Sequence, residues 1–314
     1  MDNSPDVTRQ QGSTGAKRQK RLVVVLASIV AVMAIIYLGI SAVMADKLSR
    51  PDRKSLTSTP SADRLSYESV QFPSAIDGIL LKGWFIDSPG TKTILMMHGR
   101  NGIRDDTNIG VMDVANGLAQ AGYDVLTFDF RAHGESGGTR YSLGQWEVQD
   151  VAGALEYLKS RAITSVGALG YSMGASTEIL AAADHPEMRV LVADAPFADL
   201  SALLDVQLPK ASGLPGFFNP GVIFMVRSLY GIDVTSVKPI QAIPRLNNRP
   251  MLLIHGTADE TIPVDHAYMF EKAGAGNPNF ETWIVPGAAH VESFKDHPQE
   301  YLKRVIGFFD RYLK

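Results

Sequence analysis

The chain of 314 residues contains no cysteine. This absence excludes a disulfide framework, a thiol nucleophile, acylation of a lipoprotein-type cysteine and a zinc site with cysteine ligands. It does not identify the compartment, because a cysteine-free chain suits oxidising and reducing surroundings alike. Hydrophobic residues make up 45% of the chain, which is enough for one large core or two small ones. The sequence contains no internal repeat.

The charges are distributed unevenly along the chain. Residues 1–64 carry a net charge of +5 and the remainder a net charge of −8. A basic leader on an acidic body favours attraction to anionic lipid headgroups over binding to nucleic acid. We therefore expect no nucleic-acid partner, and the sequence identifies no protein partner.

Residues 22–45 form an uncharged run dominated by Val, Leu, Ile and Ala. About 20 apolar residues span a bilayer as a helix, so we expect one transmembrane signal anchor that binds the bilayer through this run. A cleaved signal peptide is the alternative, because Val43-Met44-Ala45 would suit cleavage, although such peptides normally have a shorter apolar region. The polar residues 1–21 are expected to be a disordered basic leader, and residues 46–64 a stalk.

The orientation of the anchor follows less directly from the charges. Five basic residues precede the run and five follow it, so the positive-inside rule gives a tie. The tighter cluster at 17–21 favours an N-terminus inside the cell. We thus expect a single-pass membrane protein whose catalytic domain is extracytoplasmic.

Residues 65–314 read as one α/β domain. Short continuous apolar runs typical of buried parallel strands alternate with amphipathic helices, which predicts a doubly wound, mostly parallel sheet of eight strands with helices on both faces. The first two strands form an antiparallel hairpin. The expected strands are 67–72, 80–87, 93–97, 123–129, 165–170, 189–194, 251–255 and 281–285.

The most informative motif is Gly-Tyr-Ser-Met-Gly at residues 170–174, directly after an apolar run. A buried strand that ends in Gly-x-Ser-x-Gly is typical of a nucleophile elbow, in which a tight turn exposes the serine hydroxyl. The motif makes Ser172 the candidate nucleophile. It also leaves the backbone amide of Met173 at a helix N-terminus, where it can donate to an oxyanion.

A serine nucleophile needs a base, and the base needs a residue that orients it. His290 follows a late strand and a Pro-Gly-Ala-Ala loop, and Asp259 follows the strand that ends in His-Gly-Thr-Ala-Asp. The order Ser172, Asp259, His290 is the order of triads on the α/β-hydrolase fold. Asp194, at the end of another strand, is the alternative acid. The other histidines considered, at 255, 266 and 297, are expected to have structural roles.

Two further strand ends carry polar motifs. His98-Gly99-Arg100-Asn101-Gly102 suits a second oxyanion donor, the amide of Arg100, with His98 holding the loop. The segment 129–138, Asp-Phe-Arg-Ala-His-Gly-Glu-Ser-Gly-Gly, is rich in metal-ligand types, but no second ligand pair stands at metal spacing. We interpret it as a loop that shapes the pocket floor, and we expect neither a metal nor a cofactor.

Together these motifs resemble the α/β-hydrolase superfamily over residues 65–314, and look most like its serine-aminopeptidase-like and dienelactone-hydrolase-like branch. The resemblance implies Ser172 as nucleophile, His290 as base, Asp259 as orienting acid, and Arg100 and Met173 as oxyanion donors. The chain departs from the family in two places: Gly-Ala-Ala-His stands where Gly-x-Gly-His is common, and Arg100 stands where many members have a smaller residue.

Residues 197–250 lie where α/β-hydrolases insert a cap. The segment is rich in Leu and Phe and is divided by prolines, which indicates either helices that only cover the sheet or a small helical lid over an acyl pocket. We therefore expect a membrane-anchored serine hydrolase that cleaves acyl or lipid-like esters or thioesters through an acyl-enzyme. The alternatives are a serine peptidase of the same mechanism and a non-catalytic binding protein on the same fold.

Overall fold

The computed structural model describes residues 11–63 and 65–314. Its centre is an eight-stranded sheet in the order β1-β2-β4-β3-β5-β6-β7-β8. β1 pairs antiparallel with β2, β2 pairs antiparallel with β4, and every other pair is parallel. The strands are β1 (Tyr67–Pro73), β2 (Leu80–Ile86), β3 (Lys92–Met97), β4 (Tyr123–Phe128), β5 (Val166–Tyr171), β6 (Met188–Asp194), β7 (Met251–Gly256) and β8 (Phe280–Val285).

This architecture confirms the expected fold class, and each strand lies within a residue or two of the range predicted for it. The agreement has a physical cause. Strands β4, β5 and β7 are buried along their whole length, because helices cover both faces of the sheet, and their apolar runs are therefore continuous.

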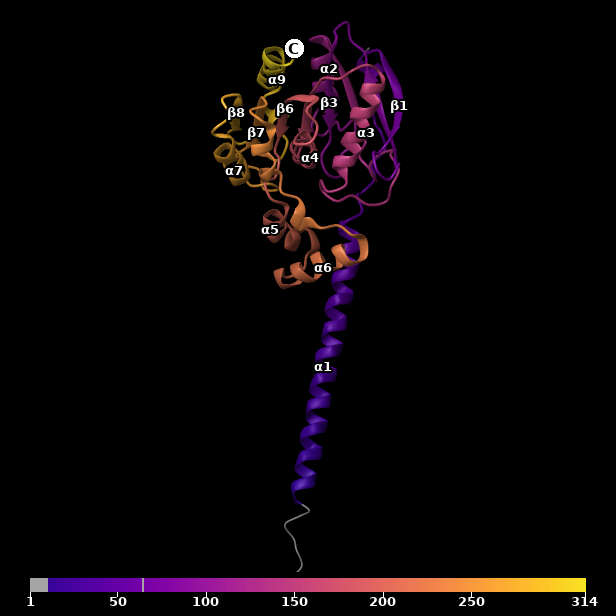
Figure 1. Cartoon of the computed structure of the whole chain (residues 1–314), viewed down its shortest axis with the longest axis vertical. Coiled ribbons are helices and arrows are strands. Elements are labelled where there is room, and N and C mark those ends of the chain that lie inside the picture. The colour runs from indigo at the N-terminus through magenta and orange to yellow at the C-terminus, as the bar shows by residue number, and fades with distance from the viewer. Residues whose placement is uncertain (1–10, 64) are drawn as a thin grey trace, which may run out of the picture.

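Two layers of helices sandwich the sheet (Figure 1). One apolar core lies under α3 (Glu147–Ser160), α4 (Met173–Ala182) and α7 (Asp265–Gly274). The other lies under α2 (Val111–Gln120) and α9 (Pro298–Tyr312), with the short α8 (Ser293–Asp296) beside it.

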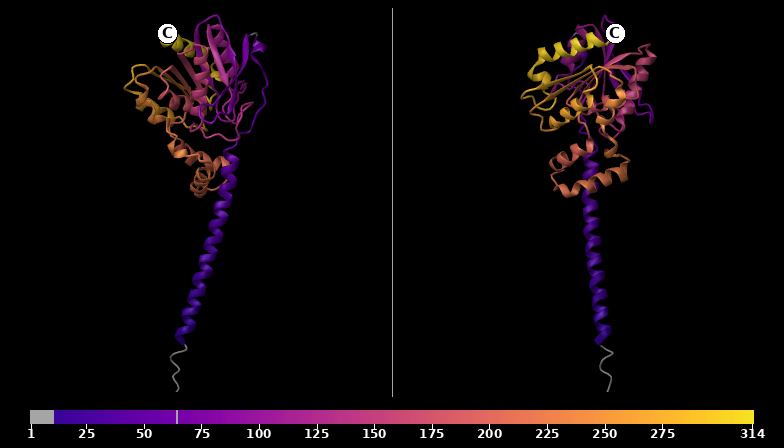
Figure 2. Two further views of the ribbon diagram at one scale, coloured as in Figure 1. Left: turned by 45° about the vertical axis from the view of Figure 1, so that its right-hand side comes forward. Right: turned by 60° about the vertical axis from the view of Figure 1, so that its left-hand side comes forward.

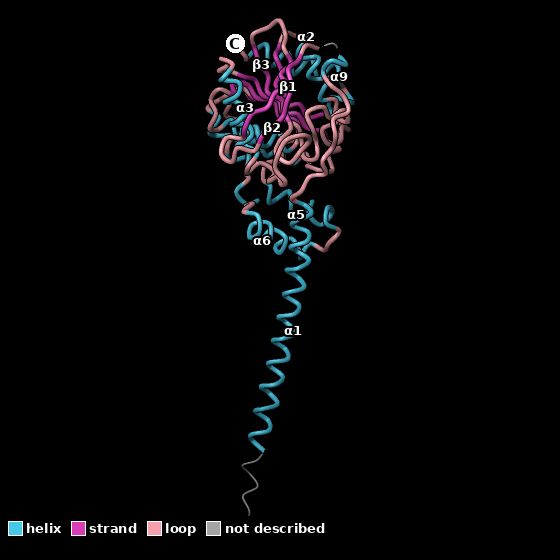
Figure 3. Tube along the Cα trace, turned by 90° about the vertical axis from the view of Figure 1, so that its right-hand side faces the viewer, coloured by secondary structure: helices cyan, strands magenta, loops and turns pink. Residues whose placement is uncertain are grey.

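The expected lid segment is present between β6 and β7 and contains two helices of its own. These are α5 (Leu200–Ser212) and α6 (Asn219–Tyr230), joined by the short 3-10 helix η2 (Gly216–Phe218). Three further 3-10 turns, η3 (Val234–Ser236), η4 (Pro239–Gln241) and η5 (Ile243–Leu246), return the chain to β7. Figure 3 shows α5 and α6 below the body, next to the long helix α1.

Helix α1 (Gln11–Leu48) is 38 residues long and leaves the body as a straight rod (Figures 1 and 2). It is long and apolar enough to cross a membrane, and its side chains from Leu22 to Ile36 are exposed. The helix begins at Gln11, so residues 11–21 are helical where we had expected disorder; residues 1–10 lie outside the described residues. The apolar run after Arg21 is helical, and the same helix includes the polar residues 11–21 before it.

The last turns of α1 pack against the lid. Ser41, Ala45 and Ser49, which are spaced one turn apart, are the buried positions of this stretch, and Tyr37, one turn before Ser41, is part-buried. The Tyr37 hydroxyl donates to the Phe217 carbonyl (2.9 Å) and accepts from the Gly221 amide (3.0 Å). Ala45 belongs to the same apolar cluster as the lid residues, so α1 and the lid share one core.

The segment after α1 differs from the stalk that the sequence predicts. The Arg53 guanidinium donates to the carbonyls of Gly134 (2.9 Å), Ser136 (2.7 Å) and Gly138 (2.6 Å). The Thr57 amide donates to the buried Asp105 carboxylate (2.6 Å), and the 3-10 turn η1 (Pro60–Asp63) follows. Residues 49–59 are therefore a strap tied along the body. Residue patterns do not reveal this strap, because the partners of Arg53 are backbone carbonyls far away in the chain.

We expect Arg53→Ala to lower the free energy of unfolding by about 1–2 kcal/mol, because hydrogen bonds from a charged donor are stronger than neutral ones. Lys54→Ala is the matched control: its ammonium lies 3.5 Å from Asp106 and is 41% exposed, so this ion pair contributes little. Urea unfolding of the full chain in detergent measures both. Equal losses in the two variants would contradict the importance of the strap.

Candidate active site

Ser172 lies in the tight turn between β5 and α4. Its backbone angles, φ 53° and ψ −114°, fall in a region that a residue with a side chain rarely adopts. A Cβ at Gly170 would overlap the backbone of Ala175 in α4, and a Cβ at Gly174 would overlap the Met97 carbonyl at the end of β3. Glycine is required at both positions, which explains the motif.

The structure brings Ser172, Asp259 and His290 together at the carboxyl ends of the strands. His290 Nε2 is 2.8 Å from Ser172 Oγ, and His290 Nδ1 is 2.7 Å from Asp259 Oδ2. The Asp259 side chain is fully buried, whereas the His290 ring is 21% exposed. The geometry is that of a hydroxyl, a base and an orienting acid in series.

The Asp259 carboxylate has a dense set of donors. The amides of Thr261 (2.9 Å) and Ile262 (2.7 Å) donate to Oδ1, and His255 Nε2 lies 3.4 Å from Oδ2. Burial alone would raise the pKa of Asp259, but hydrogen bonds from His255 and His290 outweigh it and hold this pKa well below its usual range. Asp259 is therefore ionised at every pH near neutrality.

His255 has a place that the sequence analysis only partly anticipated. Its ring is fully buried, and Nε2 donates to the Ile262 carbonyl (2.7 Å), which braces the loop as expected. Its Nε2 also lies 3.4 Å from Asp259 Oδ2, the oxygen that His290 Nδ1 contacts. No motif in the sequence signals this second contact.

The alternative acid, Asp194, is buried at the end of β6, and burial raises its pKa to about 7. Within the described residues no hydrogen bond joins it to His290, whose Nδ1 is bonded to Asp259. The remaining candidate histidines have structural positions. His266 Nδ1 accepts from the Ala198 amide (3.1 Å), and His297 stands at the start of α9.

The expected oxyanion loop, residues 98–102, is held by two buried histidines. His98 Nδ1 donates to the Gly99 carbonyl (2.7 Å) and Nε2 accepts from the Phe130 amide (3.0 Å). His133 Nδ1 donates to the Arg131 carbonyl (2.8 Å) and Nε2 accepts from the Asn101 amide (3.2 Å). Both rings therefore bond as neutral imidazoles. The backbone of Arg100 lies between these anchored points.

The segment 129–138 contributes to this support. The Arg104 guanidinium pairs with the carboxylates of Asp129 and Glu135, and Arg131 pairs with the buried Asp150. These carboxylates are thus engaged by arginines, and the His133 ring is engaged by backbone groups. The arrangement is that of a braced loop under the site.

A hollow of about 410 Å³ opens at Ser172. Arg100 and Met173, the candidate oxyanion residues, line it together with Ser172 and His290. Helix α5 forms its roof, and most of the remaining lining is apolar: Leu143, Phe197, Leu200, Leu203, Leu204, Ala211 and Ile262. The described lining contains no carboxylate side chain.

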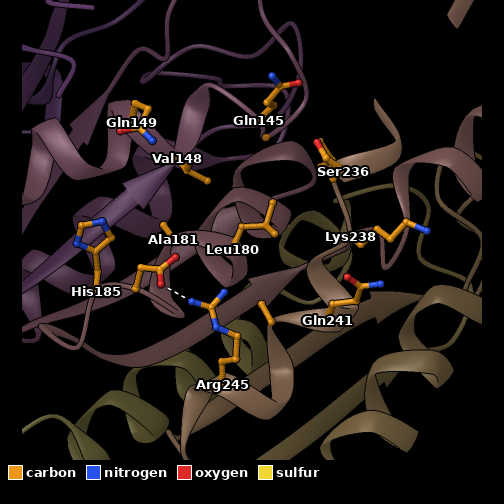
Figure 4. A pocket seen from close by; sticks show the side chains of 14 residues that line it. Gln145, Val148, Gln149, Leu180, Ala181, His185, Ser236, Lys238, Gln241 and Arg245 are labelled. Carbon is orange, nitrogen blue, oxygen red and sulfur yellow. Dashed lines mark hydrogen bonds and ion pairs between the residues drawn. The ribbon is translucent and has the colours of Figure 1, made fainter. Parts of the chain in front are cut away.

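A second hollow of about 500 Å³ lies between the start of α3, the end of α4 and the 3-10 turns η3–η5 (Figure 4). Its wall is more polar and includes Gln149, His185, Lys238 and Gln241, with an ion pair between Asp184 and Arg245. None of the triad residues lines it. It is therefore separate from the candidate active site.

A family model described as the prolyl oligopeptidase family matches residues 111–314, so the chain belongs to that family, within the α/β-hydrolase superfamily. The uncharacterized protein YqkD of Bacillus subtilis is 28% identical over 264 residues, which cover 80% of this chain and 81% of that protein. The α/β hydrolase domain-containing protein WAV2 of Arabidopsis thaliana is 24% identical over 272 residues, covering 82% and 83%.

Among solved structures, the Pyrococcus furiosus esterase Pf2001 superposes with a TM-score of 0.72 at 28% identity. The match covers 84% of this chain and 100% of the esterase. These similarities confirm the superfamily expected from the motifs, and they make the protein a hydrolase of ester or peptide type.

We expect His133→Ala to lower kcat about tenfold with little change in KM, because the Asn101 amide loses its acceptor and the neighbouring Arg100 amide loses its position. His185→Ala, on the loop after α4 and away from the triad, is the matched control. Steady-state kinetics on a p-nitrophenyl ester measure both. An unchanged kcat in His133→Ala would show that the loop does not need this brace.

Burial lowers the pKa of His98 to about 4. Above the unfolded-state pKa of about 6.5 the ring is neutral in both states, and the folded state has its full stability. As the pH falls from there towards the folded-state pKa, only the unfolded state binds the proton, so the free energy of unfolding decreases. Between pH 7.5 and pH 5.0 this amounts to about 2 kcal/mol. Urea unfolding should show that the wild type loses about this much more stability than His98→Gln over the interval. Equal losses of stability in the wild type and in His98→Gln would contradict the lowered pKa of His98.

Proposed function

We propose that the protein is a membrane-anchored serine hydrolase that cleaves the carboxylic ester or thioester bonds of acyl or lipid-like substrates through an acyl-enzyme. The observation that carries the proposal is the unbroken hydrogen-bond series from Asp259 through His290 to Ser172, at the mouth of an apolar hollow. The strained backbone of Ser172 supports it, because such strain persists where function requires it.

In the proposed reaction, His290 Nε2 takes the proton of the Ser172 hydroxyl as Oγ attacks the substrate carbonyl. The amides of Arg100 and Met173 donate to the oxyanion that forms. His290 then gives its proton to the leaving alcohol or thiol as the bond to the carbonyl carbon breaks. A water molecule, deprotonated by His290, attacks the acyl-enzyme and releases the carboxylic acid and Ser172. Asp259 stabilises the imidazolium in both steps.

The hollow favours an acyl substrate. A chain bound beside Leu203 and Leu204 gains about 0.8 kcal/mol for each methylene that it buries. A peptidase of the same mechanism is the second candidate, and the name of the family favours it. An aminopeptidase, however, needs an acid for the free amino terminus of its substrate, and the described lining of this hollow offers none.

Helix α1 is the proposed anchor. Its exposed apolar side chains and the basic residues before Leu22 suit a signal anchor, with the catalytic domain on the extracytoplasmic side. The packing of Tyr37, Ser41 and Ala45 against the lid supports retention of the helix, because cleavage after Ala45 would remove all three contacts.

We expect Ser172→Ala to lose labelling by a fluorophosphonate probe and on the order of a million-fold in turnover. Ser228→Ala, on the exposed side of α6, is the control and should label like the wild type. Gel fluorescence of the full chain in detergent is the measurement. A wild type that neither labels nor turns over would favour the non-catalytic alternative.

We expect kcat/KM to be about tenfold higher for p-nitrophenyl octanoate than for the acetate, which corresponds to burying about two of the additional methylenes against the apolar roof. Leu203→Asp, which places a charge in that roof, should remove most of the preference. Aminoacyl p-nitroanilides in the same assay test the peptidase alternative. A preference for acetate, or faster cleavage of the anilides, would count against an acyl or lipid-like ester as the substrate.

A further inference from the structure

The lid has an apolar outer face. On α6, Val222 and Val226 are buried against the body, and at about 100° per residue Phe224 points to the opposite side. Phe224 is 58% exposed, and Phe217, just before the helix, is 64% exposed. We call Phe217, Pro220 and Phe224 the lid face. Side chains of this size are rarely left exposed together on a soluble surface without a binding role.

The lid face continues the apolar surface of α1. The Tyr37 ring is stacked on Phe218 (5.0 Å between centroids) and Phe217 (6.4 Å). Gly221 is the point of closest approach: a Cβ there would lie 2.5 Å from Ser41 Oγ. Helix α6 also lies across α1 rather than along it (Figure 2). If α1 crosses a bilayer, α6 therefore lies roughly parallel to the membrane surface.

The length of α1 gives the depth of α6. A helix needs about 20 residues to cross the hydrocarbon core, which is about 30 Å thick. Counted from Leu22, the first residue after the basic cluster, 20 residues end at Ser41, where Gly221 packs. Tyr37, an aromatic residue with a polar tip, is of the type enriched at this level. The span therefore places α6 at the boundary between hydrocarbon and headgroups.

Contacts of Asp46, near the end of α1, hold α6 at this position along α1. Asp46 accepts from the Arg140 guanidinium and from the Tyr230 hydroxyl (3.0 Å), so α1, the body and the end of α6 meet at one carboxylate. The Arg140 guanidinium also lies over the Tyr230 ring, 3.5 Å from its centroid. The lid is thus held to the anchor by packing at Gly221 and by charge at Asp46.

The catalytic hollow adjoins a smaller hollow on the underside of the lid. It shares Leu143 and Leu204 with this smaller apolar hollow, which is lined by Leu48 of α1 and by Val222 and Val226 of α6. The apolar lining is therefore continuous from Ser172 to the junction of anchor and lid. A lipid at this junction can present its acyl chain to the site along apolar side chains.

From these contacts we infer that the lid face is a second membrane-binding surface: Phe217 and Phe224 insert into the interfacial region of the bilayer that α1 crosses, and substrate enters the catalytic hollow from that bilayer. The inference rests on the proposed membrane anchoring and ester hydrolysis. The occupant of the lid face is the phospholipid surface itself. Arg227, which is exposed on α6 and lies 3.3 Å from Asp233, can meet its phosphates.

Because the chain contains no cysteine, a single introduced cysteine labels one site only. Phe224→Cys carries an environment-sensitive fluorophore in full-length protein in vesicles of phosphatidylcholine and phosphatidylglycerol. We expect blue-shifted emission and strong quenching by doxyl-labelled lipids. Gln120→Cys, at the end of α2 and at the opposite edge of the sheet, is the control and should show neither. Equal quenching at the two positions would overturn the inference.

Ile29→Cys, in the middle of the exposed part of α1, separates the inference from its premise. Quenching at Ile29 without quenching at Phe224 means that the anchor spans the bilayer but the lid face does not bind it. Absence of quenching at Ile29 instead contradicts the anchoring itself.

Kinetics test the route of entry. Phe224→Ser should lower the rate on a diacylglycerol dispersed in the vesicles roughly tenfold, while the rate on soluble p-nitrophenyl butyrate stays unchanged. Tyr268→Ser removes a comparably exposed aromatic from α7 and should change neither rate. Unchanged rates in Phe224→Ser, or equal falls on both substrates, would overturn entry from the bilayer. A wild type inactive on both substrates would contradict the proposed hydrolysis, whereas the labelling would still report on the lid.

Discussion

The close approach of β5 to α4 is the constraint on which the rest of the site depends. Gly170 allows β5 and α4 to approach without a Cβ between them, and Gly174 does the same for α4 and the end of β3. Ser172 takes the strained turn that connects β5 to α4. The Ser172 amide is held by the Asp194 carbonyl (2.8 Å), so β6 fixes the turn from the other side. Asp259 and His290 reach this point because β7 and β8 end at the same edge of the sheet.

How much could be predicted from the sequence depended on how local the signal was. Continuous apolar runs indicate the buried strands, so these could be located from the sequence. The three candidate site residues follow strand ends and could be located in the same way. The strap could not, because Arg53 bonds to carbonyls some 80 residues away and a carbonyl has no sequence signature. The helix at residues 11–21 could not be predicted either, because the polar and basic composition of this segment is typical of a disordered leader.

The histidines show the same limit within the site. Four of those considered lie at or near strand ends, and pattern alone separated His290 from the others by its place in the chain order. That His133 supports Asn101, and that His255 reaches Asp259, depends on how loops from different strands meet. Such contacts follow from the tertiary fold and cannot be found from residue spacing. The sequence therefore indicated the candidate residues Ser172, Asp259 and His290 better than the residues that surround them.

Helix α1, the strap and the lid segment form one connected system, in which α1 is packed against the body rather than loosely tethered to it. Ala45 is packed in the lid core, Asp46 joins α1 to Arg140 and Tyr230, and Arg53 ties the following segment to the loop 129–138 beneath the site. A force on α1 is therefore transmitted both to the roof of the hollow and to its floor. A helix that served only as a tether would need none of these contacts, because a free flexible segment would serve equally well. Their presence means that the position of α1 relative to the body is part of the geometry of the site.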